Sequence, residues 1–280
     1  MNNKTKHPIY IIKANGQRVP FDQRKVIATC ERAGANRKLA RDVAQKVQLQ
    51  IREGMRTREV YRLVLASLSS FKEGWVIRHR YRLKEAIMQL GPSGFPFENY
   101  VSKILESHGY QIQSVRTISS GRCVNHELDI VVYLPESKKK YLVECKYHNA
   151  PGIFTGLKES LYTHARFLDL SETFDGELLV CNTKVSREVI TYAKCIGQNV
   201  ISWRYPPNIG LENMIQNKGL YPLTILPLSK NELLSLSKNN IMVAKDLLLV
   251  GLSQLSSQTG IPPERIRRLQ DLITQIMGRF

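Results

Sequence analysis

Two segments with strand-like composition carry charged residues inside apolar runs, and this feature most constrains how the chain can fold. HELDIVVYL (126–134) contains Asp129, and YLVECKYH (141–148) contains Glu144 and Lys146. Alternate side chains of a strand share a face, so Glu144 and Lys146 point the same way, and Asp129 joins them if the segments pair as a hairpin. Charges within such apolar runs are costly unless they are paired or bind a metal ion.

These three charged groups suit the hydrolysis of a phosphodiester. Two carboxylates supply the hard oxygen ligands that Mg²⁺ prefers. A neighbouring lysine can position an attacking water and stabilise the charge that develops on the phosphate. The alternative is a surface hairpin with an ordinary salt bridge. The order of the two strands, with the lysine two residues after the glutamate, favours the metal site.

The same residues resemble the PD-(D/E)xK nuclease superfamily, and within it the Mrr-like restriction endonuclease branch. The resemblance implies a core in the order helix, three strands, helix, strand, helix, strand. Matching segments follow in that order: a helix at 94–110, strands at 111–118, 126–134 and 141–148, a helix at 152–170, a strand at 176–183, a helix at 187–197 capped by Ser186, and a strand at 198–203. It also implies that Asp129 and Glu144 hold Mg²⁺ while Lys146 orients the nucleophilic water.

Further residues take roles that the resemblance implies. Glu98 lies on the first helix, where many relatives place a carboxylate near the metal, although a solvated helix face is an alternative. His126 and His148 flank the acidic strands and are expected to contact substrate phosphates. Leu128 stands where the superfamily name has proline, and this leaves the carboxylate of the next residue unchanged. Duplex cleavage needs two such sites, so we expect a homodimer.

The first ninety residues have a different pattern. Residues 11–26, IIKANGQRVPFDQRKV, predict a β-hairpin with a tight two-residue turn at Asn15-Gly16, then a helix capped by Asp22 and ended by Gly34. Three more amphipathic helices are expected, at 37–52, at 57–70 with Thr57 as the cap, and at 75–90.

This region resembles the ATP-cone, the regulatory nucleotide-binding domain of ribonucleotide reductases and their repressors. The similarity lies in a K-x-x-G-x-x-x-x-F-D-x-x-K-V frame, the T-R-E-V helix start and an R-x-R-x-R-L segment. It implies that Lys13 and Lys25 contact the phosphates of ATP or dATP and that Thr57 lies near the nucleotide. Ala14 replaces the usual arginine, and Arg18 is expected to compensate. No Walker loop occurs, so we expect the nucleotide to be sensed rather than hydrolysed.

The charge distribution supports an anion-binding N-terminal region. Residues 1–92 carry 20 Lys and Arg against 7 Asp and Glu, a net charge of +13, whereas residues 93–280 carry 21 against 17. A local excess of this size attracts polyanions such as nucleotide phosphates, DNA or RNA.

The C-terminal segment predicts four or five short helices over residues 229–276, with breaks at 239–240 and 260–262. It resembles the helix-hairpin-helix domains of recombinases. The resemblance implies that Gly260 and Ile261 form a turn whose amides meet a DNA phosphate. The nearby basic residues Arg265, Arg267 and Arg268 would add charge. The alternative is a bundle that contacts protein or braces the nuclease. Residues 204–227 are expected to form a connection with one short helix near 210–217.

Together these observations predict a multidomain α/β protein. We expect an ATP-cone built from a small β-hairpin and helices at 1–92, an α/β core with a mixed sheet at 93–207, and a linker with a C-terminal helical domain at 208–280. The expected function is Mg²⁺-dependent DNA endonuclease regulated by an adenine nucleotide. The alternatives are a nucleotide-responsive nucleic-acid-binding regulator with an inactive nuclease fold, and a junction or flap nuclease.

Cysteine spacing and the distribution of apolar residues bear on disulfides, zinc binding and membrane association. Five scattered cysteines without C-x-x-C spacing argue against a disulfide framework and a zinc ribbon. No run of 18 apolar residues and no apolar h-region in MNNKTKHPIY occur, so we expect a cytoplasmic protein without a membrane partner.

Overall fold

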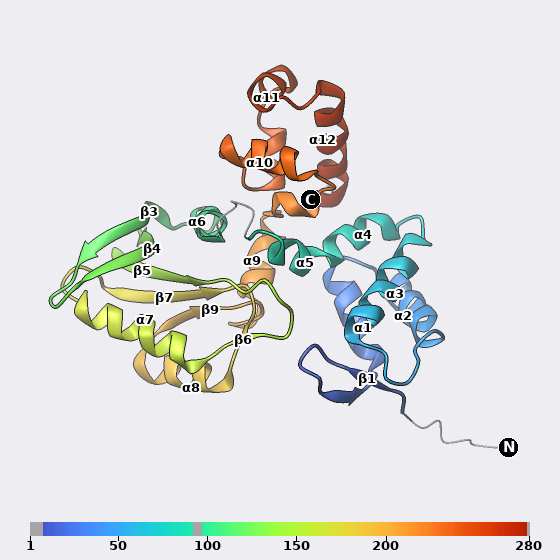
Figure 1. The fold of residues 1–280 in the computed structure, drawn as a ribbon, viewed down its shortest axis with the longest axis horizontal. Helices are drawn as coiled ribbons and strands as arrows, with labels where there is room; N and C mark the ends of the chain where they lie inside the picture. Colours follow the sequence, from blue (N-terminus) through green and yellow to red (C-terminus); the bar gives the residue numbers. More distant parts are fainter. Residues whose placement is uncertain (1–7, 92–96, 279–280) are drawn as a thin grey trace. The chain divides into compact units, whose positions relative to one another are not determined.

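The structure is a computed structural model that describes residues 8–91 and 97–278, and the chain divides into two compact units. The first unit extends to Leu83, and the second runs from Lys84 to Met277 (Figure 1). Across the described ranges, every helix is too short or too polar to cross a membrane.

The first unit joins a small β-hairpin to helices. Its elements are β1 (Tyr10–Ile12), β2 (Arg18–Pro20), α1 (Gln23–Arg32), α2 (Arg37–Gln48), α3 (Thr57–Ser69) and α4 (Gly74–Tyr81). The apolar faces of the helices form its core, which includes the fully buried Cys30, Ala40, Val43, Val47 and Leu68. The expected cap is present, because the side chain of Asp22 accepts from the amide of Arg24. Gly34 follows α1 with a left-handed φ of 94°.

The hairpin turn differs from the predicted two-residue turn. The amide of Lys13 donates to the carbonyl of Gln17 at 2.9 Å, and the amide of Gly16 donates to the carbonyl of Lys13 at 2.9 Å. Three residues therefore separate the hydrogen-bonded pair, and Gly16 has a φ of 81°. A three-residue loop places one residue in the left-handed region, which glycine occupies without steric cost.

Two helix predictions near the end of this unit also need correction. Thr57 is the first residue of α3, and the capping position is Arg56, whose amide donates to the side chain of Glu59 at 2.8 Å. The single helix expected at 75–90 is broken at Arg82 into α4 and α5 (Leu83–Met88). The amide of Arg82 bonds to the carbonyls of both Arg78 and His79, which tightens and ends the helical turn there.

A five-stranded mixed sheet forms the centre of the second unit. Its strands lie in the order β3 (Gln111–Ser120), β4 (Asn125–Leu134), β5 (Lys139–Lys146), β7 (Gly176–Cys181) and β9 (Asn199–Ile201). The first three strands are antiparallel, and β5, β7 and β9 are parallel. A parallel pair needs a crossover, and here each crossover contains a helix.

These helices cover both faces of the sheet. In Figure 1, α6 (Phe97–Ser107) lies on one side, whereas α7 (Leu157–Asp169) and α8 (Arg187–Ile196) lie on the other. Ser186 caps α8 as expected by accepting from the amide of Val189. The helix expected from residue 152 begins at Leu157, because β6 (Phe154–Thr155) pairs with β8 (Lys184–Val185). The expected start of α6 at 94–96 lies outside the described residues.

Short helices complete the second unit. They are α9 (Leu211–Asn217), η1 (Leu223–Ile225), α10 (Lys230–Lys238), η2 (Ala244–Leu248), α11 (Leu252–Thr259) and α12 (Pro263–Met277). The predicted breaks are present, with left-handed φ values of 58° at Asn240 and 70° at Gly260. The hydroxyl of Tyr100 on α6 donates to the carbonyl of Leu220 at 2.5 Å, so this region packs against the sheet domain.

Candidate functional site

The pairing of β4 with β5 brings three predicted site residues together. Ile130 lies opposite Val143 in the antiparallel register, so the preceding Asp129 lies beside Glu144. Oδ2 of Asp129 accepts a hydrogen bond from the amide of Cys145 at 2.7 Å. Nζ of Lys146 lies 2.6 Å from Oε1 of Glu144, whose side chain is only 5% exposed. Two carboxylates and an ammonium group therefore share one end of these strands.

The electrostatics of this cluster are those of crowded, partly desolvated acids. Burial, with the nearby carboxylates of Glu144 and Glu98, raises the pKa of Asp129 to about 6, although the hydrogen bond from Cys145 opposes the rise. Glu98 on α6 thus belongs to the same electrostatic environment, and its Oε2 lies 3.3 Å from Nη2 of Arg116. Burial lowers the pKa of Lys146, but its hydrogen bond to Glu144 and the negative charges of Glu144 and Asp129 together outweigh this effect, so the net shift of the pKa is upward.

Arg166 on α7 is a member of this site that we did not predict. Its Nη1 forms an ion pair with Oε2 of Glu144, so cations occupy both oxygens of that carboxylate. The Arg166 side chain is 10% exposed, its Nε has no hydrogen-bond partner in the described structure, and its guanidinium lies 4.9 Å from the centre of the Tyr162 ring. An arginine on the sheet-facing side of the expected helix was the available signal, because buried arginines are almost always paired.

The donor set fits Mg²⁺ through Asp129 and Glu144. Within residues 8–91 and 97–278, no cluster of three or more His, Cys, Asp and Glu side chains is placed to hold a metal ion. Mg²⁺ does not require one, because it commonly keeps several waters and takes one or two carboxylates together with substrate phosphates. Binding at Glu144 would exchange its contacts with Lys146 or Arg166 for the metal.

The two predicted histidines have protein partners. Nε2 of His126 lies 2.8 Å from Oδ2 of Asp169. The same carboxylate accepts from the amide of Cys123 at Oδ1 and from the amide of Val124 at Oδ2. Nε2 of His148 lies 3.1 Å from Oγ1 of Thr155. Burial lowers the pKa of His148, which favours the neutral ring. Both imidazoles support neighbouring loops, and their contact with substrate phosphates stays a prediction.

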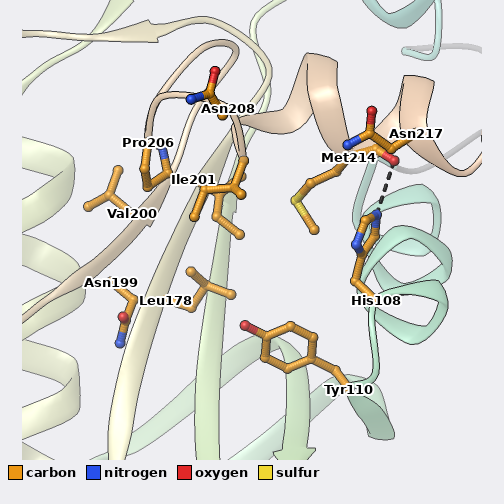
Figure 2. A pocket seen from close by; sticks show the side chains of 11 residues that line it. His108, Tyr110, Leu178, Asn199, Val200, Ile201, Pro206, Asn208, Met214 and Asn217 are labelled. Atoms are coloured by element: carbon orange, nitrogen blue, oxygen red, sulfur yellow. Dashed lines mark hydrogen bonds between the residues drawn. The ribbon is translucent and has the colours of Figure 1, made fainter.

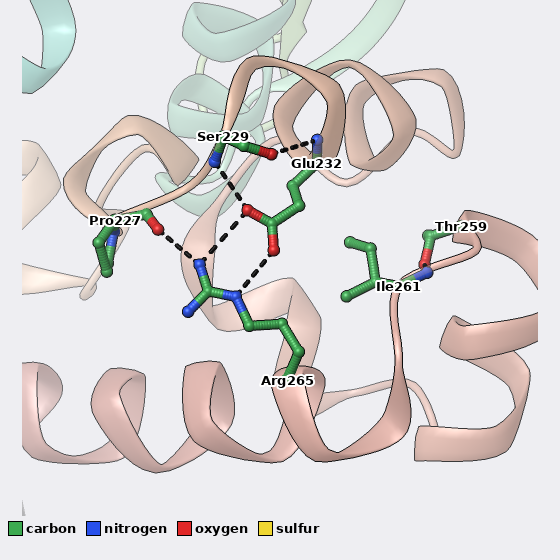
Figure 3. A network of polar contacts seen from close by, with 6 residues as sticks. All are labelled: Pro227, Ser229, Glu232, Thr259, Ile261 and Arg265. Carbon is green, nitrogen blue, oxygen red and sulfur yellow. Dashed lines mark hydrogen bonds and ion pairs between the residues drawn. The ribbon is translucent and has the colours of Figure 1, made fainter.

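The C-terminal turn differs from the expected phosphate-binding arrangement. The amide of Gly260 donates to the carbonyl of Ser256 at 2.9 Å, and the amide of Ile261 lies 3.3 Å from Oγ1 of Thr259. These bonds satisfy the end of α11, so neither amide is free for a phosphate. Figure 3 shows that Arg265 is also engaged, with its Nε 2.7 Å from Oε1 of Glu232 and its Nη2 2.6 Å from the carbonyl of Pro227.

The other basic residues of this segment differ from Arg265 in their exposure to solvent. Arg267 and Arg268 are exposed on α12, whereas Arg265 is half-buried beside α10. The expected role of Arg268 in nucleic-acid binding therefore stays a prediction, while Arg265 connects two helices of the bundle.

Two of the predicted nucleotide-binding residues lie side by side in the first unit. Ile12 forms a parallel bridge with Arg56, so the next residues on each segment, Lys13 and Thr57, are neighbours. The side chain of Lys13 is exposed, and its Nζ donates to Gln17 at 2.8 Å.

The other two predicted nucleotide-binding residues are exposed as well. Arg18 pairs with Glu53, and its guanidinium lies 4.6 Å from the centre of the Tyr10 ring. Lys25 is exposed in the first turn of α1.

A cavity of about 390 Å³ opens beside β9 (Figure 2). Leu178, Ile201 and Met214 supply apolar walls, and Nε2 of His108 lies 3.0 Å from the carbonyl of Met214. The residues that line it in the described structure carry no Lys, Arg, Asp or Glu, so its chemistry differs from that of the Asp129–Glu144 cluster. The periodicity of the sequence contained no sign of this cavity, because it is formed by segments distant in the chain.

Comparisons with known proteins found family matches at both ends of the chain. The ATP cone domain family matches residues 9–85, and the family described as AF1548-like, C-terminal matches residues 221–277. A protein of Archaeoglobus fulgidus, named only as uncharacterized, is 35% identical over 179 residues, which are 64% of this chain and all of that protein.

Solved structures extend the comparison. The crystal structure of AF1548, titled a protein of unknown function, is 34% identical with a TM-score of 0.57, and the match covers 65% of this chain and 97% of that chain. The structure of Can2 from Sulfobacillus thermosulfidooxidans in complex with cyclic tetra-adenylate is 15% identical, covers 73% of this chain and 64% of that one, and has a TM-score of 0.30, too low to support an inference. The chain belongs to the AF1548-like family and carries an ATP cone domain at residues 9–85.

Proposed function

We propose that the chain is a metal-dependent DNA endonuclease with a PD-(D/E)xK-type active site at Asp129, Glu144 and Lys146. The supporting observation is the meeting of two carboxylates from paired strands with a lysine whose Nζ lies 2.6 Å from Glu144. Natural proteins seldom place three charged groups at the buried end of a sheet unless they bind or react with something.

Each residue has a distinct task in this proposal. Asp129 and Glu144 would hold Mg²⁺, which when bound polarises the phosphodiester and lowers the pKa of a water molecule. Lys146, whose pKa is raised by Glu144, stays protonated and stabilises the negative charge that builds on the phosphate. Glu98 adds a third negative charge that favours the cation, and the product would carry a 5′-phosphate.

We propose further that an adenine nucleotide bound by the cone regulates this site. The match of residues 9–85 to the ATP cone domain supports the proposal, as does the net charge of +13 on residues 1–92. Lys13, Arg18 and Lys25 would meet the phosphates, with Thr57 beside Lys13. ATP and dATP are the ligands to test, and calorimetry on the full chain should show binding that Lys13→Ala weakens and Lys38→Ala leaves unchanged.

Cleavage assays test the nuclease proposal. The full chain is incubated with Mg²⁺ and with plain, methylated, branched or single-stranded DNA, with and without ATP. Asp129→Asn and Lys146→Ala should each reduce cleavage by on the order of 10²-fold or more. Lys103→Ala, an exposed lysine on α6, is the control. Nucleic-acid binding without cleavage of any substrate would support the alternative, a regulator with an inactive nuclease fold.

A further inference from the structure

The segment between β5 and α7 exposes two large apolar side chains. Ile153 is 43% exposed and Phe154 is 52% exposed. Phe154 lies in β6, and the pairing of β6 with β8 places it opposite Lys184, which is also exposed. The next residues on these strands, Thr155 and Val185, are both buried, so the alternation of a strand turns Phe154 and Lys184 toward solvent together. An exposed aromatic ring therefore lies beside a cation.

A buried polar network holds this segment at the end of the sheet that carries the candidate active site. His148 lies two residues beyond Lys146, and its Nε2 is 3.1 Å from Oγ1 of Thr155, the residue after Phe154. The amide of His148 donates to the side chain of Asn182 at 2.8 Å, and the Asn182 side chain donates back to the carbonyl of His148 at 2.8 Å. Phe154 and Lys146 are thus fixed at the same end of the sheet.

Two further cations lie near Lys184. The amide of Trp203 donates at 2.9 Å to the carbonyl of the residue that precedes Lys184, and Nζ of Lys84 lies 5.6 Å from the centre of the Trp203 ring. Burial and the positive charges of Lys184 and Arg204 lower the pKa of Lys84. The carboxylate of Glu212 acts in the opposite direction and is the weaker influence. An anion bound beside these lysines would relieve the crowding of positive charge.

We propose that this surface binds an unpaired DNA strand, with a base stacked on Phe154 and phosphates held by Lys184 and Lys84. Proteins that bind single strands combine a positively charged surface with aromatic rings on which the bases stack. A duplex keeps its bases paired inside the helix, so a stacking ring selects a strand whose bases are unpaired. The lysines supply charge for the phosphates without reading the sequence.

The proposal rests on the proposed function, because it defines the class of DNA that the same site would receive. Since Phe154 and Lys146 lie at the same end of the sheet, a strand bound at one can extend to the other. Phe154 would determine which strands bind and takes no part in the chemistry. It is therefore a positioning residue, and DNA binding can be measured separately from cleavage.

Fluorescence anisotropy of the full chain tests the proposal, with labelled oligodeoxythymidine and a labelled duplex of the same length as probes. EDTA is added so that the DNA stays intact. Phe154→Ala should weaken binding of the single strand by on the order of tenfold, the effect of losing one stacked base, and leave binding of the duplex unchanged. Lys184→Ala should weaken binding of the single strand and reduce the slope of log affinity against log salt by about 0.7.

Two matched controls and one spectroscopic variant accompany this assay. Lys139→Ala removes an exposed lysine at the opposite end of β5, and Leu49→Ala shortens an 81% exposed leucine of the first unit. Neither should change binding of the single strand. Phe154→Trp should keep the affinity of the wild type, and oligodeoxythymidine should quench the fluorescence of the new indole, a signal that a merely structural role would not produce.

The outcomes separate this proposal from the nuclease proposal. A wild type that binds no single strand, a Phe154→Ala variant that binds it as tightly as the wild type, or equal losses for the single strand and the duplex would each overturn the strand-binding surface. If the wild type nevertheless cleaves DNA, the nuclease proposal stands. Binding of the single strand through Phe154 without Mg²⁺-dependent cleavage of any DNA would have the opposite meaning, because the surface would stand and the nuclease proposal would fail.

Discussion

The hydroxyl of Tyr147 donates to the carbonyl of Met88 at 2.6 Å and accepts from the amide of Gly91 at 3.0 Å. Tyr147 directly follows Lys146 at the end of β5, whereas Met88 ends α5, just after the segment that matches the ATP cone domain. One side chain therefore connects the strand of the candidate active site to the segment that leads out of the cone.

Replacing Tyr147 with Phe tests this connection. The ring should keep its packing against Phe97, whose centroid lies 5.6 Å away, but both hydrogen bonds are lost. We expect a loss of about 1–2 kcal/mol in the free energy of unfolding, measured by chemical denaturation. If the cone regulates cleavage through this contact, the effect of ATP on the cleavage rate should also shrink.

The control is Tyr133→Phe, which removes a hydroxyl that makes no hydrogen bond among the described residues. Equal loss of stability in both variants would contradict the assigned role of the Tyr147 hydroxyl.

Asp129 should make the stability of the protein depend on pH. Its pKa is about 6 in the folded chain and 3.8 in an unperturbed carboxyl, so the folded state binds the proton more tightly. The free energy of unfolding therefore falls as pH rises from about 4 to about 6, and above that range the whole decrease is present. Asp129→Asn should raise the free energy of unfolding at pH 8 by about 1–2 kcal/mol after allowance for solvent screening.

The same variant should have no advantage below pH 4, where the carboxyl is protonated in both states. Adding Mg²⁺ at pH 8 should raise the melting temperature of the wild type but not that of Asp129→Asn. A Mg²⁺ response of equal size in the two proteins would count against a metal site at this carboxylate.

Removing Arg166 should separate stability from metal binding. Arg166→Ala leaves the buried Glu144 with Lys146 as its remaining cation, and we expect the chain to lose about 3 kcal/mol of stability. The variant should nevertheless need less Mg²⁺ for half-saturation in thermal-shift titrations, because the arginine no longer competes for Oε2. Arg187→Ala, at an exposed position on α8, should change neither quantity. Weaker Mg²⁺ binding by Arg166→Ala would contradict this competition.

The two arginines of α12 should have opposite phenotypes. Arg265→Ala breaks its contacts with Glu232 and Pro227 and should destabilise the protein by about 1 kcal/mol, with little effect on DNA affinity. Arg268→Ala should leave stability unchanged and, if α12 meets DNA, reduce the slope of affinity against salt by about one unit. Denaturation and salt-dependent DNA-binding assays on both variants distinguish an arginine that stabilises the helical bundle from one that contacts DNA.

Many local features of this chain follow from sequence patterns. Asp22 and Ser186 cap their helices, and Asn240 and Gly260 interrupt the C-terminal helices, because each residue type favours that backbone conformation. The mixed sheet and the meeting of Asp129 with Glu144 also follow, since alternation and strand order determine which side chains share a face.

Tertiary packing determined which side chains from distant segments of the chain come into contact. Arg166 reaches Glu144 only because α7 crosses over β5, and the Tyr147 hydroxyl finds Met88 across a long loop of chain. Long-range packing also assigned Arg265 to Glu232, where local spacing had suggested a phosphate contact. The complete burial of Ser160 and Thr163 on α7 has the same origin, because helical periodicity shows which residues share a face, whereas only the packed sheet determines which face is buried.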